Sequence, residues 1–352
     1  MGIRLGSRAV CSLGDENVRK IAVFRALHLG DFICAVPALK ALKKQHPLAE
    51  LTYIGLPWLR AIADRFACID RFLEFPGYLG LEGLSIDGDA SQRFVRDARD
   101  YRYDLAIQMH GDGSVSNEFV AQLGARVSIG YRPIGCDLPN LLDLELEIDR
   151  EEHEVLRWLR LVEVLGAQGS PDLEFPLLAD DLEEANAVLL KAGIDPAQPL
   201  LAIHPGAKDP ERRWPVASFA AAADLLAEQL GTQVVITGTA SEAAIGRAVA
   251  ESMSVPAAVL SGCSSIGGLA ALLARASLLI TNDTGPSHLA AAIGVPSVVL
   301  FGPTKPSRWA PLDVKKHRAI WSGCGNPISQ IPVSRVVDES LELVSECASQ
   351  MS

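Results

Sequence analysis

Short apolar runs alternate with helical patterns along most of the chain, and polar turns join them. The runs at residues 21–25 and 104–109 have the length of buried strands, and residues 90–102 have the spacing of a helix. The pattern stops after residue 167 and restarts with a further apolar run at residues 200–204. Strands that alternate with helices across short connections predict an α/β protein with two doubly wound parallel sheets.

The interruption of this pattern sets the predicted domain organisation. Residues 167–178 contain glycine, serine and proline and have the character of a linker. We predict an N-terminal lead-in over residues 1–20, a Rossmann-like domain over residues 21–170 and a second Rossmann-like domain over residues 171–352. With 49% hydrophobic residues, a chain of 352 residues can build a sizeable core in each domain.

One polar turn in the second half carries the most chemical information. It joins the apolar run at residues 276–280 to a helix that ends at Gly294, and Pro286 suits the first position of that helix. The unpaired N–H groups and the helix dipole at such a turn can bind an anion. Two interpretations are open: Asp283 or Thr284 only caps the helix, or the turn is the floor of a site for a phosphate-bearing ligand.

The predicted topology favours the second interpretation. Right-handed crossovers between parallel strands bring every loop at a strand's carboxyl end to the same edge of the sheet. Ligands of open α/β sheets bind at that edge. The loops of the second half that share it are residues 204–214, 237–242, 261–265, 281–287 and 301–308. Three polar residues on or beside these loops are further candidates for the site, namely His204, Thr237 and Ser261.

A second strand–turn–helix, in the first half, contains Gly30 and Asp31. It has no GxGxxG pattern, so the sequence does not predict a dinucleotide site there. Gly30 lets the backbone turn tightly or approach a ligand. Asp31 has two interpretations, a helix cap or a carboxylate that faces a cleft. His110 follows the strand at residues 104–109 and lies at the same predicted edge, although a single histidine at a strand end is more often structural.

Composition and charge exclude several classes of function. The net charge of −11 argues against non-specific nucleic-acid binding, because phosphates demand a basic surface. The 7 cysteines are scattered without a CxxC pair, so we expect neither a zinc site nor a disulfide framework, and dispersed thiols favour a reducing cytoplasm. No apolar run is long enough to span a membrane, and residues 1–20 lack the apolar stretch of a signal peptide.

One short pattern points to a metal and is set aside. The tripeptide at residues 87–89, Asp-Gly-Asp, matches the metal-binding DxD pattern of some sugar-nucleotide enzymes. It consists of only three residues in a turn-prone stretch, and no buried strand precedes it. An ordinary turn explains the tripeptide better, so we predict no metal site.

Three motifs give the sequence its resemblance to a known family. The first is the turn at residues 30–39 (GDFICAVPAL). The second combines residues 204–206 (HPG) with residues 212–215 (RRWP). The third combines residues 281–290 (TNDTGPSHLA) with residues 302–304 (GPT). In these motifs, and over most of its length, the chain resembles glycosyltransferase family 9, the ADP-heptose:lipopolysaccharide heptosyltransferases of GT-B architecture.

The resemblance implies an enzyme that transfers a heptose, with inversion, from ADP-heptose to a sugar hydroxyl of a lipopolysaccharide core or a similar glycan. It implies that Asp31 is the general base and that a basic residue two places before the tryptophan, here Arg212, holds the donor phosphates. Arginine and a helix dipole can carry the phosphate charge, so no metal or other cofactor is expected. The residues that match the donor-binding turn of the family are Asp283, Thr284, Gly285 and His288, and Lys208 is expected to assist Arg212.

The implied partners are a nucleotide-sugar donor and a glycan or lipid-linked glycan acceptor. A lipid-linked acceptor implies a cytoplasmic enzyme at the inner face of the inner membrane, in peripheral contact and without a transmembrane segment. Three alternatives stay open: another donor, an epimerase that uses Asp31, His110 and His204 as acid and base groups, or a non-catalytic protein that binds sugar nucleotides. Residues 77–89 and 134–142 match nothing in the family and leave the acceptor open.

Overall fold

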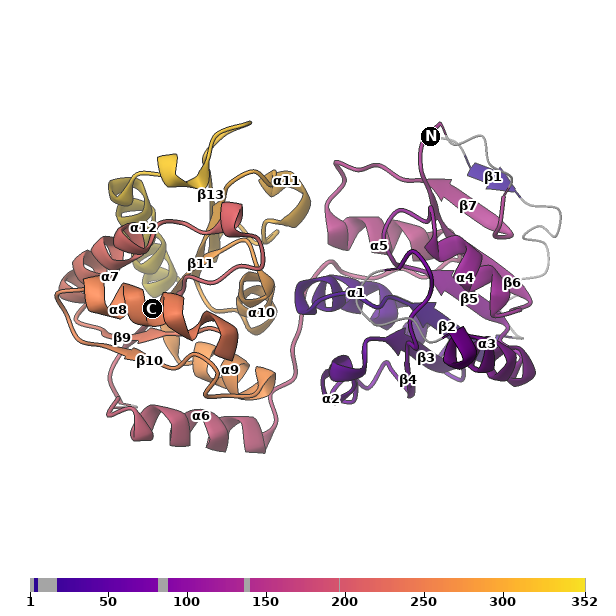
Figure 1. Cartoon of the computed structure of the whole chain (residues 1–352), viewed down its shortest axis with the longest axis horizontal. Helices are drawn as coiled ribbons and strands as arrows, with labels where there is room; N and C mark the ends of the chain where they lie inside the picture. The colour runs from indigo at the N-terminus through magenta and orange to yellow at the C-terminus, as the bar shows by residue number, and fades with distance from the viewer. Residues whose placement is uncertain (1–2, 6–17, 82–87, 136–139, 196, 352) are drawn as a thin grey trace. The chain divides into compact units, whose positions relative to one another are not determined.

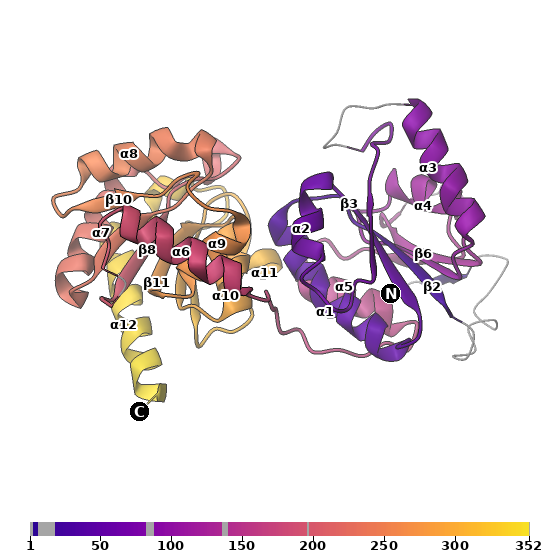
Figure 2. The same cartoon turned by 90° about the horizontal axis from the view of Figure 1, so that it is seen from below.

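The computed structural model of the chain describes residues 3–5, 18–81, 88–135, 140–195 and 197–351. The chain forms two compact units, Met1–Asp172 and Leu173–Ser352 (Figure 1). Each unit contains one sheet with helices packed on both of its faces (Figures 1 and 2). This arrangement confirms the predicted class of two doubly wound α/β domains.

The N-terminal unit is built on a seven-stranded sheet. Its strands are β1 (Ile3–Leu5), β2 (Lys20–Phe24), β3 (Glu50–Gly55), β4 (Arg71–Glu74), β5 (Leu105–Gln108), β6 (Val127–Arg132) and β7 (Leu144–Glu147). Its α-helices are α1 (Leu29–Gln45), α2 (Arg60–Ala63), α3 (Gly88–Tyr101), α4 (Ser116–Gln122) and α5 (Glu154–Glu163), and a 3-10 turn spans Pro57–Leu59.

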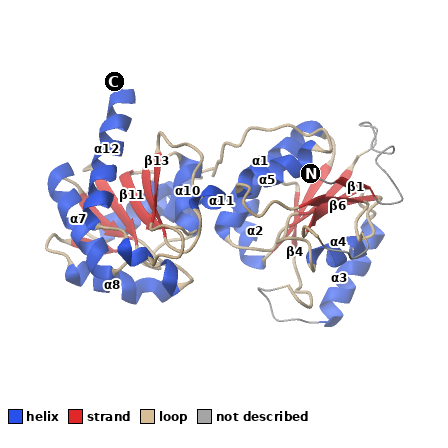
Figure 3. Ribbon diagram, turned by 90° about the horizontal axis from the view of Figure 1, so that it is seen from above, coloured by secondary structure: helices blue, strands red, loops and turns tan. Residues whose placement is uncertain are grey.

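The strands of this sheet follow the order β1-β7-β6-β5-β2-β3-β4. The pair β1–β7 is antiparallel, and the other neighbouring pairs are parallel. Helices α1, α2 and α5 cover one face, and α3 and α4 cover the other (Figures 2 and 3). The central strands β2 and β5 are buried on both faces, which explains why their sequences are continuous apolar runs without polar alternation.

The C-terminal unit is built on a six-stranded sheet of order β10-β9-β8-β11-β12-β13, and all its described pairs are parallel. Its strands are β8 (Leu200–His204), β9 (Gln233–Ile236), β10 (Ala257–Val259), β11 (Ala276–Asn282), β12 (Ser297–Phe301) and β13 (His317–Trp321). Its α-helices are α6 (Ala179–Lys191), α7 (Val216–Leu230), α8 (Ala243–Ser252), α9 (Ile266–Leu273), α10 (Gly285–Ile293), α11 (Pro306–Trp309) and α12 (Val333–Met351), and 3-10 turns span Pro210–Arg212, Ala240–Glu242 and Ile328–Gln330.

The two sheets share one topology once β1 is set aside. In each, the first strand of the alternating series lies beside the fourth, so that β2 pairs with β5 and β8 pairs with β11. Between these two strands the order along the sheet reverses, and the loops at their carboxyl ends leave in opposite directions. Ligands of open α/β sheets bind in the crevice that this reversal creates. Each unit therefore has one preferred position for a ligand.

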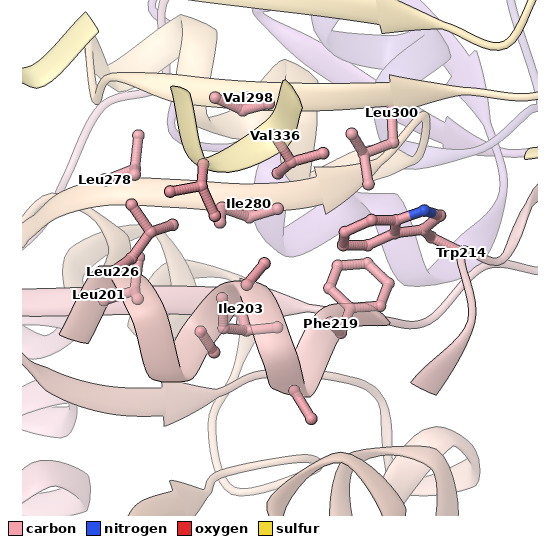
Figure 4. Packing of buried hydrophobic residues seen from close by; sticks show 14 of the residues in the cluster. Leu201, Ile203, Trp214, Phe219, Leu226, Leu278, Ile280, Val298, Leu300 and Val336 are labelled. Carbon is pink, nitrogen blue, oxygen red and sulfur yellow. The ribbon is translucent and has the colours of Figure 1, made fainter. Parts of the chain in front are cut away.

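A dense apolar core anchors the loop after β8 in the C-terminal unit. Trp214 and Phe219 pack edge to face, with ring centroids 5.1 Å apart, over the inward side chains of the sheet such as Ile203 and Leu300 (Figure 4). The Trp214 indole N–H donates to the carbonyl oxygen of Ile331 at 3.0 Å. A buried tryptophan with a satisfied N–H holds the chain beside it in a fixed position.

Several elements form where the sequence predicted none. The lead-in over residues 1–20 contains β1, and the strands β7 and β13 and the helix α12 were also missed. The sequences of β7 (LELE) and β13 (HRAIW) lack the continuous apolar run of a central strand, because β7 lies next to the edge strand and β13 lies at an edge. Of the unmatched stretches, residues 82–87 and 136–139 lie outside the described residues, and Asp87 of the DxD pattern is among them.

Candidate active site

The loop after β8 is fastened to β11 by one buried amide, that of Asn282. Its Nδ2 donates to the carbonyl oxygens of Pro205 at 2.9 Å and Gly206 at 3.3 Å. Its Oδ1 accepts from the backbone N–H of Trp214 at 3.0 Å. Both ends of the loop 205–214 are therefore tied to the strand that carries the predicted ligand turn.

Arg212 and Asp283 meet on this framework and form an ion pair. Arg212 Nη2 lies 2.7 Å from Asp283 Oδ2. The Thr304 hydroxyl, beyond β12, accepts from Arg212 Nε at 3.0 Å and from Nη2 at 2.8 Å. The Asp283 side chain is 5% exposed, whereas that of Arg212 is 31% exposed. Loops from three strands thus converge on one guanidinium that still faces solvent.

Asp283 is a partner of Arg212 and not a helix cap. Burial raises the pKa of the Asp283 carboxyl, and Arg212 and the Thr304 hydroxyl act in the opposite direction. The residue at the N-cap position of α10 is Thr284. The interpretation that Asp283 only caps the helix is therefore wrong, because its carboxylate is committed to the guanidinium.

Helix α10 begins beside this ion pair. Thr284 is extended, and its hydroxyl donates to the carbonyl oxygen of Asn282 at 3.3 Å. Gly285 is the first residue of the helix. The N–H groups and dipole of this end favour an anion. His288 lies in the same turn, buried, with its ring edge-on to Trp309 at a centroid distance of 5.8 Å.

His204 and Thr237 form a separate buried pair. His204 Nδ1 lies 3.0 Å from Thr237 Oγ1, and that hydroxyl also donates to the carbonyl oxygen of Ile203 at 3.3 Å. Burial lowers the pKa of His204 to about 4, so the imidazole is neutral at physiological pH. Lys208, in contrast, is exposed on the loop. Neither His204 nor Lys208 takes part in the hydrogen bonds described for Arg212.

Glu242 is an acidic side chain of the carboxyl edge that the sequence did not single out. It accepts from the Thr239 backbone N–H at 2.8 Å, and a Cβ at Gly206 would lie only 2.2 Å from its Oε1. A side chain at Gly206 would therefore displace the Glu242 carboxylate from its present position. Ser261 is nearby in the fold: its hydroxyl is enclosed between Gly238 and Gly246, where added Cβ atoms would lie 2.8 and 2.9 Å away.

The first turn of the N-terminal unit holds Asp31 against Arg25. The Asp31 carboxylate accepts from Arg25 Nη2 at 2.9 Å and from the backbone N–H of His28 at 3.3 Å. Asp31 is the third residue of α1, so it closes a capping box with the N-cap residue His28. The interpretation of Asp31 as a helix cap is therefore confirmed, and 19% of its side chain stays exposed.

Arg25 and Glu154, which the sequence did not single out, complete this cluster. Arg25 is fully buried, and its Nη2 also donates to Glu154 Oε1 at 3.0 Å. Burial raises the pKa of Asp31, Arg25 opposes the rise, and Glu154 adds to it. A carboxylate with a raised pKa and some exposure can accept a proton from a hydroxyl group.

His110 lies beside the cluster and is held by backbone and ring contacts. Its Nδ1 accepts from the backbone N–H of Ala26 at 3.2 Å, and its ring stacks on Phe24 with centroids 5.0 Å apart. Burial lowers the pKa of His110 to about 4, and the nearby Arg25 adds to the effect. Gly30 has helical backbone in the first turn of α1, so a tight turn at this glycine does not form.

Two features are absent from the described residues. Among them, no helix combines the length and the apolar character that crossing a membrane requires. No group of three or more histidine, cysteine, aspartate or glutamate side chains in the same part of the chain is arranged to hold a metal ion.

Comparisons with known proteins agree with these observations. The family model of glycosyltransferase family 9 (heptosyltransferase) matches residues 91–328. The lipopolysaccharide heptosyltransferase 1 of Pseudomonas aeruginosa is 36% identical over 291 residues, covering 82% of this chain and 79% of that protein. The lipopolysaccharide heptosyltransferase 2 of Salmonella typhimurium is 27% identical over 309 residues, covering 84% and 86%.

A solved structure extends the comparison to the fold. The Escherichia coli ADP-heptose lipopolysaccharide heptosyltransferase II superposes with a TM-score of 0.74 at 24% identity, over 93% of this chain and 99% of that chain. This similarity confirms the predicted GT-B fold class. The family model covers more than half of the chain, and the resemblance drawn from the three motifs is confirmed. The protein therefore belongs to glycosyltransferase family 9, the heptosyltransferase family.

Proposed function

We propose that the protein transfers a heptose from ADP-heptose to a sugar hydroxyl of a lipopolysaccharide core or a similar glycan, with inversion at the anomeric carbon. The observation that carries the proposal is the Arg212–Asp283–Thr304 cluster at the start of α10, at the preferred ligand position of the C-terminal sheet. The relatives named above supply the donor class, because one of them is an ADP-heptose lipopolysaccharide heptosyltransferase.

The C-terminal unit is proposed to bind the donor diphosphate. Arg212 offers a partly exposed guanidinium that Asp283 and Thr304 hold in a fixed orientation. The first turn of α10, with Thr284, Gly285 and His288, offers N–H groups and the positive end of the helix dipole. As the bond from the anomeric carbon to the diphosphate breaks, these groups stabilise the negative charge that develops on the leaving oxygen.

The N-terminal unit is proposed to supply the base. The Asp31 carboxylate takes the proton of the acceptor hydroxyl while the oxygen of that hydroxyl forms the new bond to the anomeric carbon. Its raised pKa makes it a better proton acceptor than an ordinary aspartate. In an inverting transfer the acceptor attacks from the side opposite to the leaving diphosphate. The base and the phosphate-binding groups therefore have separate roles that separate variants can test.

The donor is tested first by thermal unfolding with ADP, GDP, UDP and CDP. A ligand that binds only the folded protein adds about 2.7 kcal/mol at 100 times its dissociation constant, which is a visible shift. We expect selective stabilisation by ADP, and a preference for another nucleotide would replace the proposed donor. Release of ADP from ADP-heptose, together with a mass increase of one heptose on the acceptor, then tests the transfer itself.

The acceptor is proposed to be a lipid-linked glycan, which would place the reaction at the cytoplasmic face of a membrane. Relatives named lipopolysaccharide heptosyltransferase 1 and 2 both match, so the position of the added heptose needs its own experiment. Lipopolysaccharides truncated at successive core positions are compared in micelles and after removal of their acyl chains. A preference for one truncation identifies the acceptor sugar. Equal rates with and without acyl chains would contradict the proposal that the reaction takes place at a membrane.

A further inference from the structure

The Arg25 guanidinium is shared between two carboxylates. Its Nη2 donates to Asp31 Oδ1 at 2.9 Å and to Glu154 Oε1 at 3.0 Å. Its Nε donates to the backbone oxygen of Asp31 at 2.7 Å, and its Nη1 donates to the carbonyl oxygen of Met109. All three nitrogens are therefore engaged, and one of them divides its interaction between Asp31 and Glu154.

Glu154 is fixed in a position where its carboxylate competes with Asp31 for Arg25 Nη2. Its Oε2 pairs with Arg157 Nη1 at 2.9 Å, and its Oε1 also accepts from the Trp158 indole N–H at 3.1 Å. The Trp158 ring lies against Arg25, with the guanidinium carbon 4.6 Å from the ring centroid. Arg157, Trp158 and Glu154 all come from the first turns of α5, so this helix fixes the geometry.

The cluster is a chain of alternating charges with one open end. In the order Asp31, Arg25, Glu154, Arg157 the charges sum to zero. The side chains of Arg25, Glu154 and Arg157 are buried, and the carboxylate at the Asp31 end keeps contact with solvent. A substrate hydroxyl can therefore reach the cluster through Asp31, while Glu154 acts on the same guanidinium from the interior.

The sharing of Arg25 between two carboxylates affects the strength of Asp31 as a base. A buried arginine that served Asp31 alone would stabilise the carboxylate form and leave a weak base. Glu154 draws part of the Arg25 interaction to itself and repels a second negative charge, and both effects favour a proton on Asp31. Among the described residues, the other titratable groups near Asp31 add no second negative charge. His28 lowers the pKa of Asp31, His110 is neutral, and the Tyr53 hydroxyl donates to the Arg25 carbonyl oxygen at 2.8 Å.

We propose that Glu154 is a positioning residue that sets the proton affinity of Asp31 through the shared guanidinium of Arg25. The inference rests on the proposed function, in which Asp31 is the base. It adds a residue from the far end of the N-terminal unit's sequence, 129 positions from Arg25, that touches neither substrate.

The experiment is the pH dependence of kcat/KM for the acceptor, at saturating ADP-heptose, in the wild type, Glu154→Gln and Glu154→Asp. Glutamine keeps the size of the side chain and removes the competing negative charge. Asp31 is then the only one of the two carboxylates that shares the charge of Arg25. We expect the acidic limb of the profile to move to lower pH by about one unit and the plateau to fall about three- to tenfold, because a weaker base transfers protons more slowly. The shorter aspartate should shift the limb in the same direction by less.

Glu145→Gln is the matched control, because Glu145 forms another buried ion pair in the same unit, with Arg132 at 3.4 Å. It should leave the acidic limb in place. If Glu154→Gln does not fold, the shift of Glu154→Asp decides the question alone. An acidic limb that stays at the wild-type pH in the folded Glu154 variants overturns the inference and leaves the proposed function intact. Full activity of the Asp31→Asn variant would instead show that Asp31 is not the base, and it would overturn this inference together with that part of the proposed function.

Discussion

The proposed donor site of the C-terminal unit is built around one guanidinium, that of Arg212. Arg212 is partly exposed, and its fork is oriented by Asp283 and Thr304. Arg212→Ala should lower kcat by about 100-fold or more, the usual effect of removing one fixed charge-stabilising donor. Arg212→Lys keeps the charge, but an ammonium group cannot bond to both Asp283 and Thr304 as the planar guanidinium does. The activity of this variant should therefore lie between those of the wild type and Arg212→Ala. Initial rates of ADP release and the ADP-induced thermal shift measure both effects.

The control for this prediction removes an arginine elsewhere in the same unit. Arg318 pairs with Glu346 at 2.6 Å and makes no described contact with the Arg212 cluster. Arg318→Ala should keep wild-type kcat and the wild-type response to ADP. Equal activity of the Arg212→Ala and Arg318→Ala variants would show that the donor phosphates are bound elsewhere.

The proposed role of Asp31 as a base can be tested separately from its role in the capping box. Asp31→Asn keeps the shape of the side chain and removes the base, so transfer should fall by about 100- to 10,000-fold. Donor binding should persist, because the proposed donor site lies in the other unit. The measurements are kcat for transfer and the dissociation constant of ADP. A parallel loss of ADP affinity would count against the role of base.

Asp181 supplies the matched control for this substitution. It is the third residue of α6, and its carboxylate accepts from the backbone N–H of Leu178 at 2.8 Å, as Asp31 accepts from His28. Asp181→Asn should cost about 1 kcal/mol of stability as a weakened cap and leave kcat unchanged. A loss of transfer in Asp31→Asn alone thus separates the chemistry from the capping box.

At the scale of elements, the orientation of Arg212 depends on how the loop after β8 is fastened. Asn282 makes three buried hydrogen bonds to this loop. Asn282→Ala leaves these backbone groups unpaired and should cost about 1–3 kcal/mol. Asn282→Asp should cost more, because its carboxylate would face two carbonyl oxygens that the amide now donates to. Urea midpoints rank the variants, and ADP affinity should fall in the same order.

The elements also show what the sequence could and could not predict. Central strands such as β2 and β11 are buried on both faces, so their continuous apolar runs revealed them and the turns that follow. Asp31 and Asp283 were singled out because they lie in those turns, whereas Arg212 was singled out only by the resemblance to the family. Glu154 was not, because its contact with Arg25 joins positions 129 apart in the sequence through the packing of α5. Asn282 lay within a recognised motif, but its partners follow from strand order, which no local pattern encodes.

At the scale of the whole chain, the same strand order occurs twice, and both clusters follow from it. β2 pairs with β5 and β8 pairs with β11, so the loops after each pair leave from one crevice. Arg25 and Asp31 follow β2, and Met109, whose carbonyl oxygen accepts from Arg25, follows β5. Arg212 follows β8, and Asp283 follows β11. One topology has thus placed the cluster of Asp31, the proposed base, in one unit and the cluster of Arg212, the proposed phosphate-binding group, in the other.

Stability of the whole chain should respond to acid through buried histidines, and His317 tests this outside both clusters. It is buried, with Nδ1 2.8 Å from Ser297 Oγ. Burial lowers its pKa from 6.5 to about 4, with Lys316 adding to the effect and Asp313 opposing it. Between these values the unfolded chain binds the proton and the folded chain does not, so the stability that His317 contributes is present above pH 6.5 and is lost as the pH falls.

His317→Asn removes this titration and should change the slope of stability against pH. From pH 7 to pH 5 the free energy of unfolding should fall by about 2 kcal/mol less in the variant than in the wild type, since one pKa unit corresponds to about 1.4 kcal/mol. The raised pKa values of Asp31 and Asp283 act with the opposite sign but equally in both proteins, so they cancel in the difference. Urea unfolding followed by tryptophan fluorescence gives the comparison. Parallel curves between pH 7 and pH 5 would show that burial does not lower the pKa of His317. A constant offset between the two proteins at pH 7 and pH 8 would reflect only the lost Ser297 hydrogen bond.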